Sequence, residues 1–129
     1  MYLELALEFE LPVRLAHHSA EAQAGFPLRS LAADEGVVSP DQSVRLQGAD
    51  RRAAFGDLLD TMPEGVTELS LQPAIDTPEL RALTTQADER VGDNDLLTGA
   101  EVSDLVQQAG VQLISWAALR NLQRFERRN

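Results

Sequence analysis

Short apolar segments with the alternation of β-strands recur between helical segments along this chain. The clearest strand pattern covers residues 66–71, where apolar and polar residues alternate. A helical pattern over residues 49–62 precedes it, and a helix start follows it, with Thr77 as the capping residue and Pro78 at the first helical position. Helices and strands that alternate over short connections predict the α/β class, with a parallel sheet flanked by helices.

The rest of the chain continues this pattern. Further strands are expected at residues 12–15, 43–46 and 111–114, and further helices at residues 2–10, 98–109 and 115–128, with part of 86–95 helical as well. Thr98 and Glu101 have the spacing of a capping box, which predicts that a helix begins there. No repeat or linker interrupts the pattern, so residues 1–129 are predicted to form a single domain.

Charge and composition exclude several classes of function. The 129 residues include 21 acidic side chains and 11 arginines, with no lysine, for a net charge of −10. Such a negative field argues against nucleic acid or an anionic membrane as the partner. Cysteine is absent, which excludes thiolate chemistry, and no apolar run approaches the ~18 residues of a membrane span. A cytoplasmic location is expected.

The first helix, residues 2–10, is apolar around nearly its whole circumference. Glu4 and Glu8 form only a thin polar stripe, whereas an ordinary surface helix has a single apolar face. Such a helix needs cover on most sides, and a second copy of the chain is the simplest source of it. A homo-oligomer is therefore predicted.

Motifs for metal binding and nucleophilic catalysis are missing. His17 and His18 are the only imidazoles, and adjacent side chains rarely ligate one metal ion. Asp93 and Asp95 begin like a calcium loop, but Leu97 stands where the third ligand belongs. We predict no catalytic and no metal-ligating residue in this chain.

Gln72 has the best position for a ligand site. It ends the strand at 66–71 on the polar side that Glu68 and Ser70 share. In parallel α/β folds the carboxyl ends of the strands carry the ligand site. A neutral amide cannot act as an acid or base at ordinary pH, so the position favours binding rather than catalysis.

The order of several segments resembles a known family. Residues 65–83 read GVTELSLQPAIDTPELRAL and residues 109–119 read AGVQLISWAAL. Residues 5–15 read LALEFELPVRL, and residues 39–42 read SPDQ. Taken together these segments are similar, in the same order, to the later part of YdjC-like carbohydrate deacetylases.

The resemblance implies a divalent-metal hydrolase that removes acetyl groups from N-acetylated amino-sugar oligomers and folds as a distorted β/α barrel. This chain is then the C-terminal half, a partial (β/α) barrel-like parallel sheet flanked by helices. The family's metal ligands lie on motifs that precede the helix at Tyr2, and Gln42 and Gln72 stand where the family has histidines. We therefore expect the chain to be non-catalytic alone, with no cofactor of its own and the divalent metal held by the missing half.

Two alternatives follow from the same resemblance. The chain could be a sugar-binding or oligomerising module, or it could complement a separately encoded N-terminal segment. In the first case a carbohydrate ligand is expected in a cleft lined by Glu68, Ser70, Gln72, Asp76 and Arg81.

Overall fold

The computed structural model describes residues 2–16 and 18–128, which gather into two compact units. Unit 1 consists of Met1–Ser43, Gly65–Glu68 and Leu113–Asn129, and unit 2 consists of Val44–Glu64 and Leu69–Gln112. The division runs through both strands of the sheet, β1 (Gln42–Arg45) and β2 (Thr67–Ser70). Each unit is therefore described by itself, and the single-domain organisation stays a prediction.

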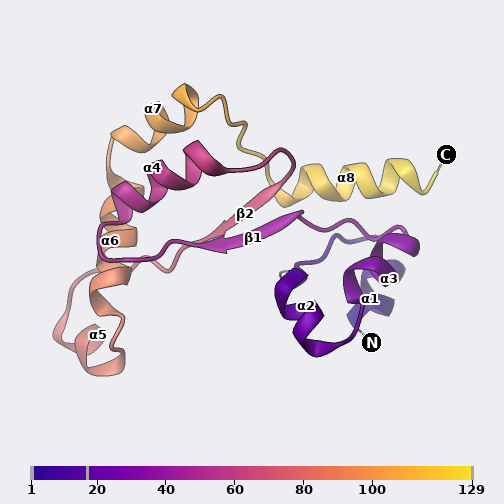
Figure 1. Ribbon diagram of the computed structural model, residues 1–129, viewed down its shortest axis with the longest axis horizontal. Helices are drawn as coiled ribbons and strands as arrows, with labels where there is room; N and C mark the ends of the chain where they lie inside the picture. The colour runs from indigo at the N-terminus through magenta and orange to yellow at the C-terminus, as the bar shows by residue number, and fades with distance from the viewer. Residues whose placement is uncertain (1, 17, 129) are drawn as a thin grey trace. The chain divides into compact units, whose positions relative to one another are not determined.

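The two strands are parallel neighbours in one sheet, as their arrows show (Figure 1). Helix α4 (Arg51–Thr61) connects them, which makes a β-α-β unit. The Gln42 N–H donates to the Val66 carbonyl at 3.1 Å, next to β2. The α/β character predicted from the sequence is confirmed.

A barrel-like sheet is not seen in the described part of the chain, where the sheet has two strands. The expected strands at residues 12–15 and 111–114 have no regular secondary structure and belong to no sheet. Val13 donates one backbone hydrogen bond to Val38, at 3.0 Å, and this isolated bond makes no ladder. An apolar alternating sequence favours an extended backbone, but a strand also needs a neighbour with which to exchange hydrogen bonds.

Unit 1 contains α1 (Tyr2–Glu8), α2 (His18–Ala24), α3 (Leu28–Asp34) and α8 (Trp116–Glu126). Its buried apolar core comprises Ala6, Val13, Leu15, Ala32 and Val37. Helix α8 is tied to the end of α1, because Arg124 and Arg127 donate to the carbonyls of Phe9 and Leu7 at 3.3 and 3.0 Å. Cations at a helix C-terminus stabilise it by meeting its unpaired carbonyls.

Unit 2 contains α4, α5 (Pro78–Leu83), α6 (Ala87–Thr98) and α7 (Glu101–Gln108). Its core is built around the buried side chains of Leu46, Phe55, Leu96 and Val106. The predicted start of α5 is confirmed, since the Thr77 hydroxyl accepts the Leu80 N–H at 3.1 Å. Asp50 caps α4 in the same way, accepting the Ala53 N–H at 2.9 Å.

The predicted capping box at Thr98 is wrong. Thr98 is the last residue of α6, and its hydroxyl donates to the Asn94 carbonyl at 2.9 Å, so it cannot cap α7. Threonine often makes this bond to the carbonyl four residues back when it lies inside a helix. The segment from residue 86 to 95, read from the sequence as partly helical, is helical from Ala87 onward.

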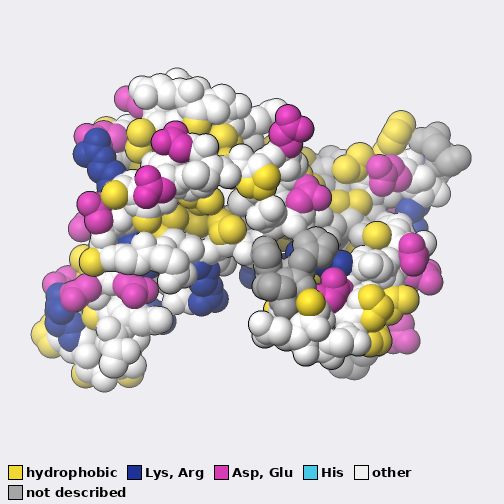
Figure 2. Space-filling model, viewed as in Figure 1, with side chains coloured by type: hydrophobic (Ala, Val, Ile, Leu, Met, Phe, Trp, Pro, Cys, Tyr) yellow, Lys and Arg dark blue, Asp and Glu magenta, His cyan; other side chains and the backbone are white. Residues whose placement is uncertain are grey.

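Two surface properties bear on the sequence predictions. Acidic side chains are spread over both units on the face seen in Figure 2, in keeping with the net charge of −10. Tyr2 and Leu5 on α1 are 70% and 48% exposed, and Phe9 directly after the helix is 56% exposed, so part of the apolar surface predicted for this segment is present. Within the described residues, no helix has the length and apolar character needed to cross a membrane.

Candidate functional site

A polar pocket of about 180 Å³ lies in unit 2, where β1 and β2 end. Helix α6 forms its third side. Its lining includes the polar side chains of Arg45, Gln47, Ser70, Gln72, Gln86 and Arg90. Pockets for drug-sized ligands are typically about 300–1,000 Å³, so this one matches a single sugar-sized unit.

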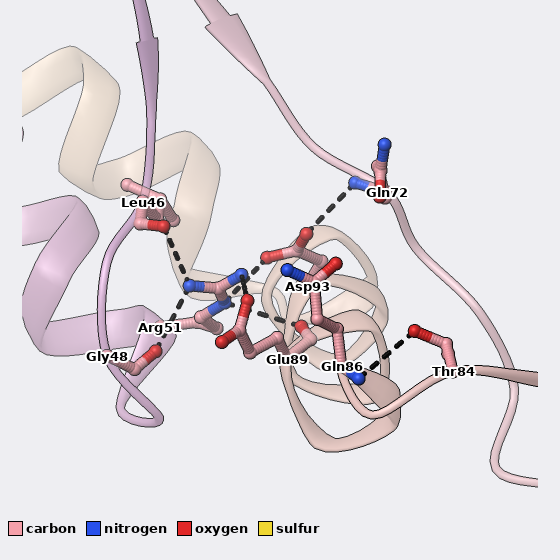
Figure 3. Close-up of polar contacts among 8 residues, drawn as sticks. All are labelled: Leu46, Gly48, Arg51, Gln72, Thr84, Gln86, Glu89 and Asp93. Carbon is pink, nitrogen blue, oxygen red and sulfur yellow. Dashed lines mark hydrogen bonds and ion pairs between the residues drawn. The ribbon is translucent and has the colours of Figure 1, made fainter. Parts of the chain in front are cut away.

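Arg51, the first residue of α4, holds the exit of β1 in place. Its guanidinium is buried and donates to the carbonyls of Leu46 and Gly48 at 2.9 and 3.0 Å. On its other side, Nη2 lies 3.4 Å from Glu89 Oε2, and Nε donates to the Glu89 carbonyl at 3.3 Å. Figure 3 shows this guanidinium between the segment after β1 and helix α6. The planar fork of arginine suits such a multiple contact.

Asp93 of α6 joins Arg51 to the exit of β2. Its Oδ1 lies 2.9 Å from Arg51 Nε, and its Oδ2 accepts the backbone N–H of Gln72 at 2.9 Å. The residue is only 3% exposed. The Gln72 side chain points away from Asp93 (Figure 3). A single buried carboxylate therefore fixes both an arginine and the backbone of a pocket residue.

A second backbone contact ties the segment after β2 to α6. The Ala74 N–H donates to the Arg90 carbonyl at 3.0 Å. The Arg90 side chain turns to the pocket, where its buried Nε has no hydrogen-bond partner among the described residues. Arg45 at the end of β1 is exposed and also lines the pocket. Neither Arg45 nor Arg90 makes an ion pair within the described part of the chain.

The structure brings two of the five predicted ligand residues to this pocket, namely Ser70 and Gln72. Glu68 belongs to unit 1, where it forms an ion pair with Arg14 and accepts a hydrogen bond from Ser43 at 3.2 Å. The hydrogen bond from Arg14 holds the pKa of the Glu68 carboxyl below its usual value, against the opposing effect of burial. The ligand-binding role of these residues stays a prediction.

Asp76 and Arg81, the other two, pair with each other. Arg81 donates to both Asp76 oxygens at 2.7 and 2.8 Å, and its Nη1 lies 3.1 Å from Asp88. The hydrogen bond from Arg81 lowers the pKa of Asp76, while the same bond raises the pKa of the guanidinium. Neither side chain is among those of the described residues that line the pocket.

The chemistry of the pocket suits binding. Its amides and hydroxyl both donate and accept hydrogen bonds, and its guanidinium groups donate only. The resemblance stated above implies a divalent metal, but the described residues gather no three His, Asp or Glu side chains that could hold one. The two carboxylates of the pocket, Glu89 and Asp93, both face the Arg51 guanidinium, so this donor set does not fit a divalent metal.

Arg45, Arg51, Arg90 and Asp93 were not identified as site residues from the sequence. Asp93 lies three residues before the buried Leu96, on the face of α6 that contacts the rest of unit 2. A charged residue at a core position of a helix is the signal that could have pointed to it. The arginines carried no such signal, because their neighbours come from distant segments.

Comparisons with known proteins give a fold likeness. No protein-family model and no curated protein matches the sequence. A solved structure from Enterococcus faecalis V583, of a protein whose name proposes cellobiose-phosphate cleavage, is similar to this chain with a TM-score of 0.69 and 25% sequence identity. The likeness covers 92% of this chain and 45% of that one, so the chain spans less than half the length of that protein.

Proposed function

We propose that this chain is the carbohydrate-binding part of a sugar-modifying hydrolase of the YdjC-like deacetylase type, and that its polar pocket binds the phosphorylated sugar unit of a disaccharide. The observation that carries the proposal is the pocket at the carboxyl ends of β1 and β2. Ser70 lines it from the end of β2 and Gln72 from the segment that follows, while Arg45 lines it from the end of β1 and Arg90 from α6. Ligands of parallel α/β folds bind at this end of the strands.

The amide and hydroxyl groups support recognition of sugar hydroxyls. Each hydroxyl of a sugar both donates and accepts a hydrogen bond, and the side chains of Gln47, Gln72 and Gln86 can do the same. Leu46 also lines the pocket and supplies apolar surface.

The two arginines without an ion pair support a phosphate on the sugar. Arg51 faces two carboxylates, Asp93 and Glu89, which also line the pocket, whereas Arg45 and Arg90 have no carboxylate partner among the described residues, so three guanidinium groups stand against two carboxylates. Guanidinium groups bind phosphate through charge-assisted hydrogen bonds, which are about twice as strong as neutral ones. In a chain of net charge −10, two such groups at one pocket favour an anionic ligand there.

The comparisons support the carbohydrate class. The name of the similar protein from Enterococcus faecalis concerns a phosphorylated disaccharide, and the sequence segments at residues 5–15, 65–83 and 109–119 resemble carbohydrate deacetylases. Because the donor set described above does not fit a metal, we assign this chain the binding of the sugar. We assign the metal ligands to a different polypeptide segment.

Calorimetry of the full chain with four probes tests the binding. Phosphorylated cellobiose is expected to bind about tenfold more tightly than cellobiose, because hydrogen bonds to charged groups contribute about 1.5–3 kcal/mol each. The N-acetylglucosamine disaccharide and inorganic phosphate separate the sugar contribution from the phosphate contribution. Arg90→Met should weaken only the two probes that carry phosphate, and Gln72→Ala should weaken all three sugars.

Two exposed residues of unit 2 serve as matched controls. Arg52→Met and Gln107→Ala change the same residue types outside the pocket and should leave binding unchanged. Absence of heat with every sugar would contradict the proposal. Acetate release from the N-acetylglucosamine disaccharide by the purified chain with a divalent metal would contradict the assignment of the metal ligands to another segment.

Self-association is proposed as a second property. The exposed apolar side chains of Tyr2 and Leu5 on α1, and of Phe9 directly after it, support it, because exposed apolar surface on a soluble protein often marks an interaction site. Sedimentation at micromolar concentration should give a dimer or larger species, and Leu5→Ser should shift it toward monomer. A monomeric wild-type chain would overturn this prediction.

A further inference from the structure

Asp93 is a buried carboxylate that holds the backbone of a pocket residue. Its Oδ2 accepts the Gln72 N–H at 2.9 Å, while Oδ1 meets Arg51 Nε at 2.9 Å. It does so from inside unit 2, at 3% exposure, and the Gln72 side chain is exposed. Gln72 can therefore reach a ligand, whereas Asp93 is nearly inaccessible to one.

The two contacts use different properties of the carboxylate. Its Oδ2 accepts a hydrogen bond from the Gln72 backbone N–H, while its Oδ1 lies 2.9 Å from Arg51 Nε as an ion pair and accepts no hydrogen bond from the described residues. An asparagine has one acceptor oxygen and no charge, so it cannot both accept the Gln72 backbone N–H and balance the Arg51 guanidinium. An apolar residue of similar size would leave the buried Arg51 guanidinium without its closest charge partner.

The same ion pair fixes the exits of both strands. Arg51 donates to the carbonyls of Leu46 and Gly48 after β1, and Asp93 receives the N–H of Gln72 after β2. The two segments that border the pocket are thus attached to one pair of side chains (Figure 3). A movement of Asp93 would move the Gln72 backbone and with it the start of the Gln72 side chain.

We infer that Asp93, oriented by Arg51, is a positioning residue. By holding the Gln72 backbone, it presents the side-chain amide of Gln72 to the sugar in the polar pocket. This inference rests on the proposed function for the role of Gln72. A glutamine side chain has several rotatable bonds, so its contribution to binding depends on how firmly its backbone is placed. Asp93 supplies that placement without touching the ligand.

Amide hydrogen exchange of the ligand-free chain tests the positioning without any sugar. In Asp93→Asn the backbone amide hydrogen of Gln72 should exchange at least tenfold faster than in the wild type. The Ala74 amide, which bonds to the Arg90 carbonyl, joins the same segment to α6 without Asp93 and serves as the internal reference. Equal acceleration of both amides would indicate general loosening of the fold and overturn the inference, as would an unchanged Gln72 rate.

A double-mutant cycle tests the link to binding. Asp93→Asn should weaken binding of phosphorylated cellobiose about tenfold, and adding Gln72→Ala to that variant should cause no further loss, because both changes remove one contribution. If the fold-losses in affinity of the two single variants multiply in the double variant, the two residues act independently, and the inference is overturned. If the wild-type chain binds no probe, the proposed function fails, and the exchange rates alone decide the positioning.

Gly92→Ala is a second variant in case Asp93→Asn does not fold. A Cβ at Gly92 would lie 2.8 Å from Arg51 Cγ, so alanine displaces Arg51 while both charges remain. It should again raise the exchange of the Gln72 amide and weaken binding several-fold. Gly56→Ala in α4, where no atom lies within 4 Å of the added Cβ, is the matched control and should change neither. Identical behaviour of the two glycine variants would overturn the inference.

Discussion

Unit 1 and unit 2 each bury an arginine that gathers backbone carbonyls from different segments. In unit 1, Arg29 donates to the carbonyls of Leu15, Ala16 and Pro40, at 3.3, 2.8 and 2.9 Å. In unit 2, Arg51 donates to carbonyls in a similar way but also meets the buried carboxylate of Asp93 at 2.9 Å. The two arginines are about equally buried, at 9% and 7% exposure.

The difference shows how a structural contact becomes part of a site. Hydrogen bonds to backbone carbonyls, such as those of Arg29, hold loop segments together. The carboxylate beside Arg51 has a second oxygen, and this oxygen extends the connection to Gln72. A buried ion pair adds little net stability compared with apolar packing, so its value here lies in placing Gln72 rather than in strengthening unit 2.

Removal of Arg51 should have the largest effect. Arg51→Met leaves Asp93 buried and charged without its partner, so we expect the free energy of unfolding to fall by about 3–5 kcal/mol. Urea denaturation followed by circular dichroism measures it. Arg52→Met is the control, since Arg52 pairs with Glu101 on the surface with 66% of its side chain exposed, and its loss should cost about 0–1 kcal/mol.

Arg29→Met should reduce the free energy of unfolding by less. The Arg29 side chain donates to three backbone carbonyls, so its removal leaves these carbonyls unpaired but takes no partner from a buried carboxylate such as Asp93. Hydrogen bonds to a charged group contribute about 1.5–3 kcal/mol, and we expect a loss in that range by the same denaturation assay. A loss as large as that of Arg51→Met would contradict the comparison. It would mean that the carboxylate of Asp93 makes no difference to the energetics.

The glycines of α4 and α6 sharpen the comparison further. Alanine favours a helix over glycine by about 1 kcal/mol, so Gly56→Ala, where the added Cβ meets nothing within 4 Å, should raise the melting temperature. Gly92→Ala brings a Cβ to 2.8 Å from Arg51 Cγ and should lower stability by about 1 kcal/mol net. Calorimetric scans measure both variants, and stabilisation by Gly92→Ala would show that Arg51 is free to move.

The smallest expected effect concerns pH in unit 1. The pKa of Glu68 is held below its usual 4.5 by the hydrogen bond from Arg14. A lowered folded-state pKa gives stability that is complete above the unfolded pKa and is lost as the pH falls through the folded value. Arg14→Met should therefore reduce the difference in urea midpoint between pH 7 and pH 3, and an unchanged difference would contradict the role of this pair.

Local signals made part of the fold predictable. The start of α5 at Thr77 and Pro78 follows from side-chain capping, which depends on neighbouring residues only. The segments at residues 12–15 and 111–114, which form no strand, were predicted as strands because alternation reports backbone preference, while sheet membership depends on a partner strand elsewhere. Thr98 was misread because the same residue suits a helix start and the last turn of a helix.

The candidate site was predictable to the same extent. Ser70 and Gln72, which line the pocket, could be placed at a strand end from the sequence because that position follows from the order of elements, and their binding role stays a prediction. Asp93 was considered only as a metal ligand, since its contacts with Arg51 and Gln72 arise from tertiary packing over 42 and 21 positions of the chain. No spacing rule in the sequence connects such residues.

Heteronuclear NMR with phosphorylated cellobiose tests the central claim most directly. Titration into the ¹⁵N-labelled chain is predicted to shift the amide signals of Ser70, Gln72, Gln86 and Arg90, with saturation at one equivalent. Arg45→Met combined with Arg90→Met should abolish these shifts at the same concentration. An unchanged spectrum, or shifts confined to the residues of unit 1, would contradict the assignment of the carbohydrate site to the pocket at the ends of β1 and β2.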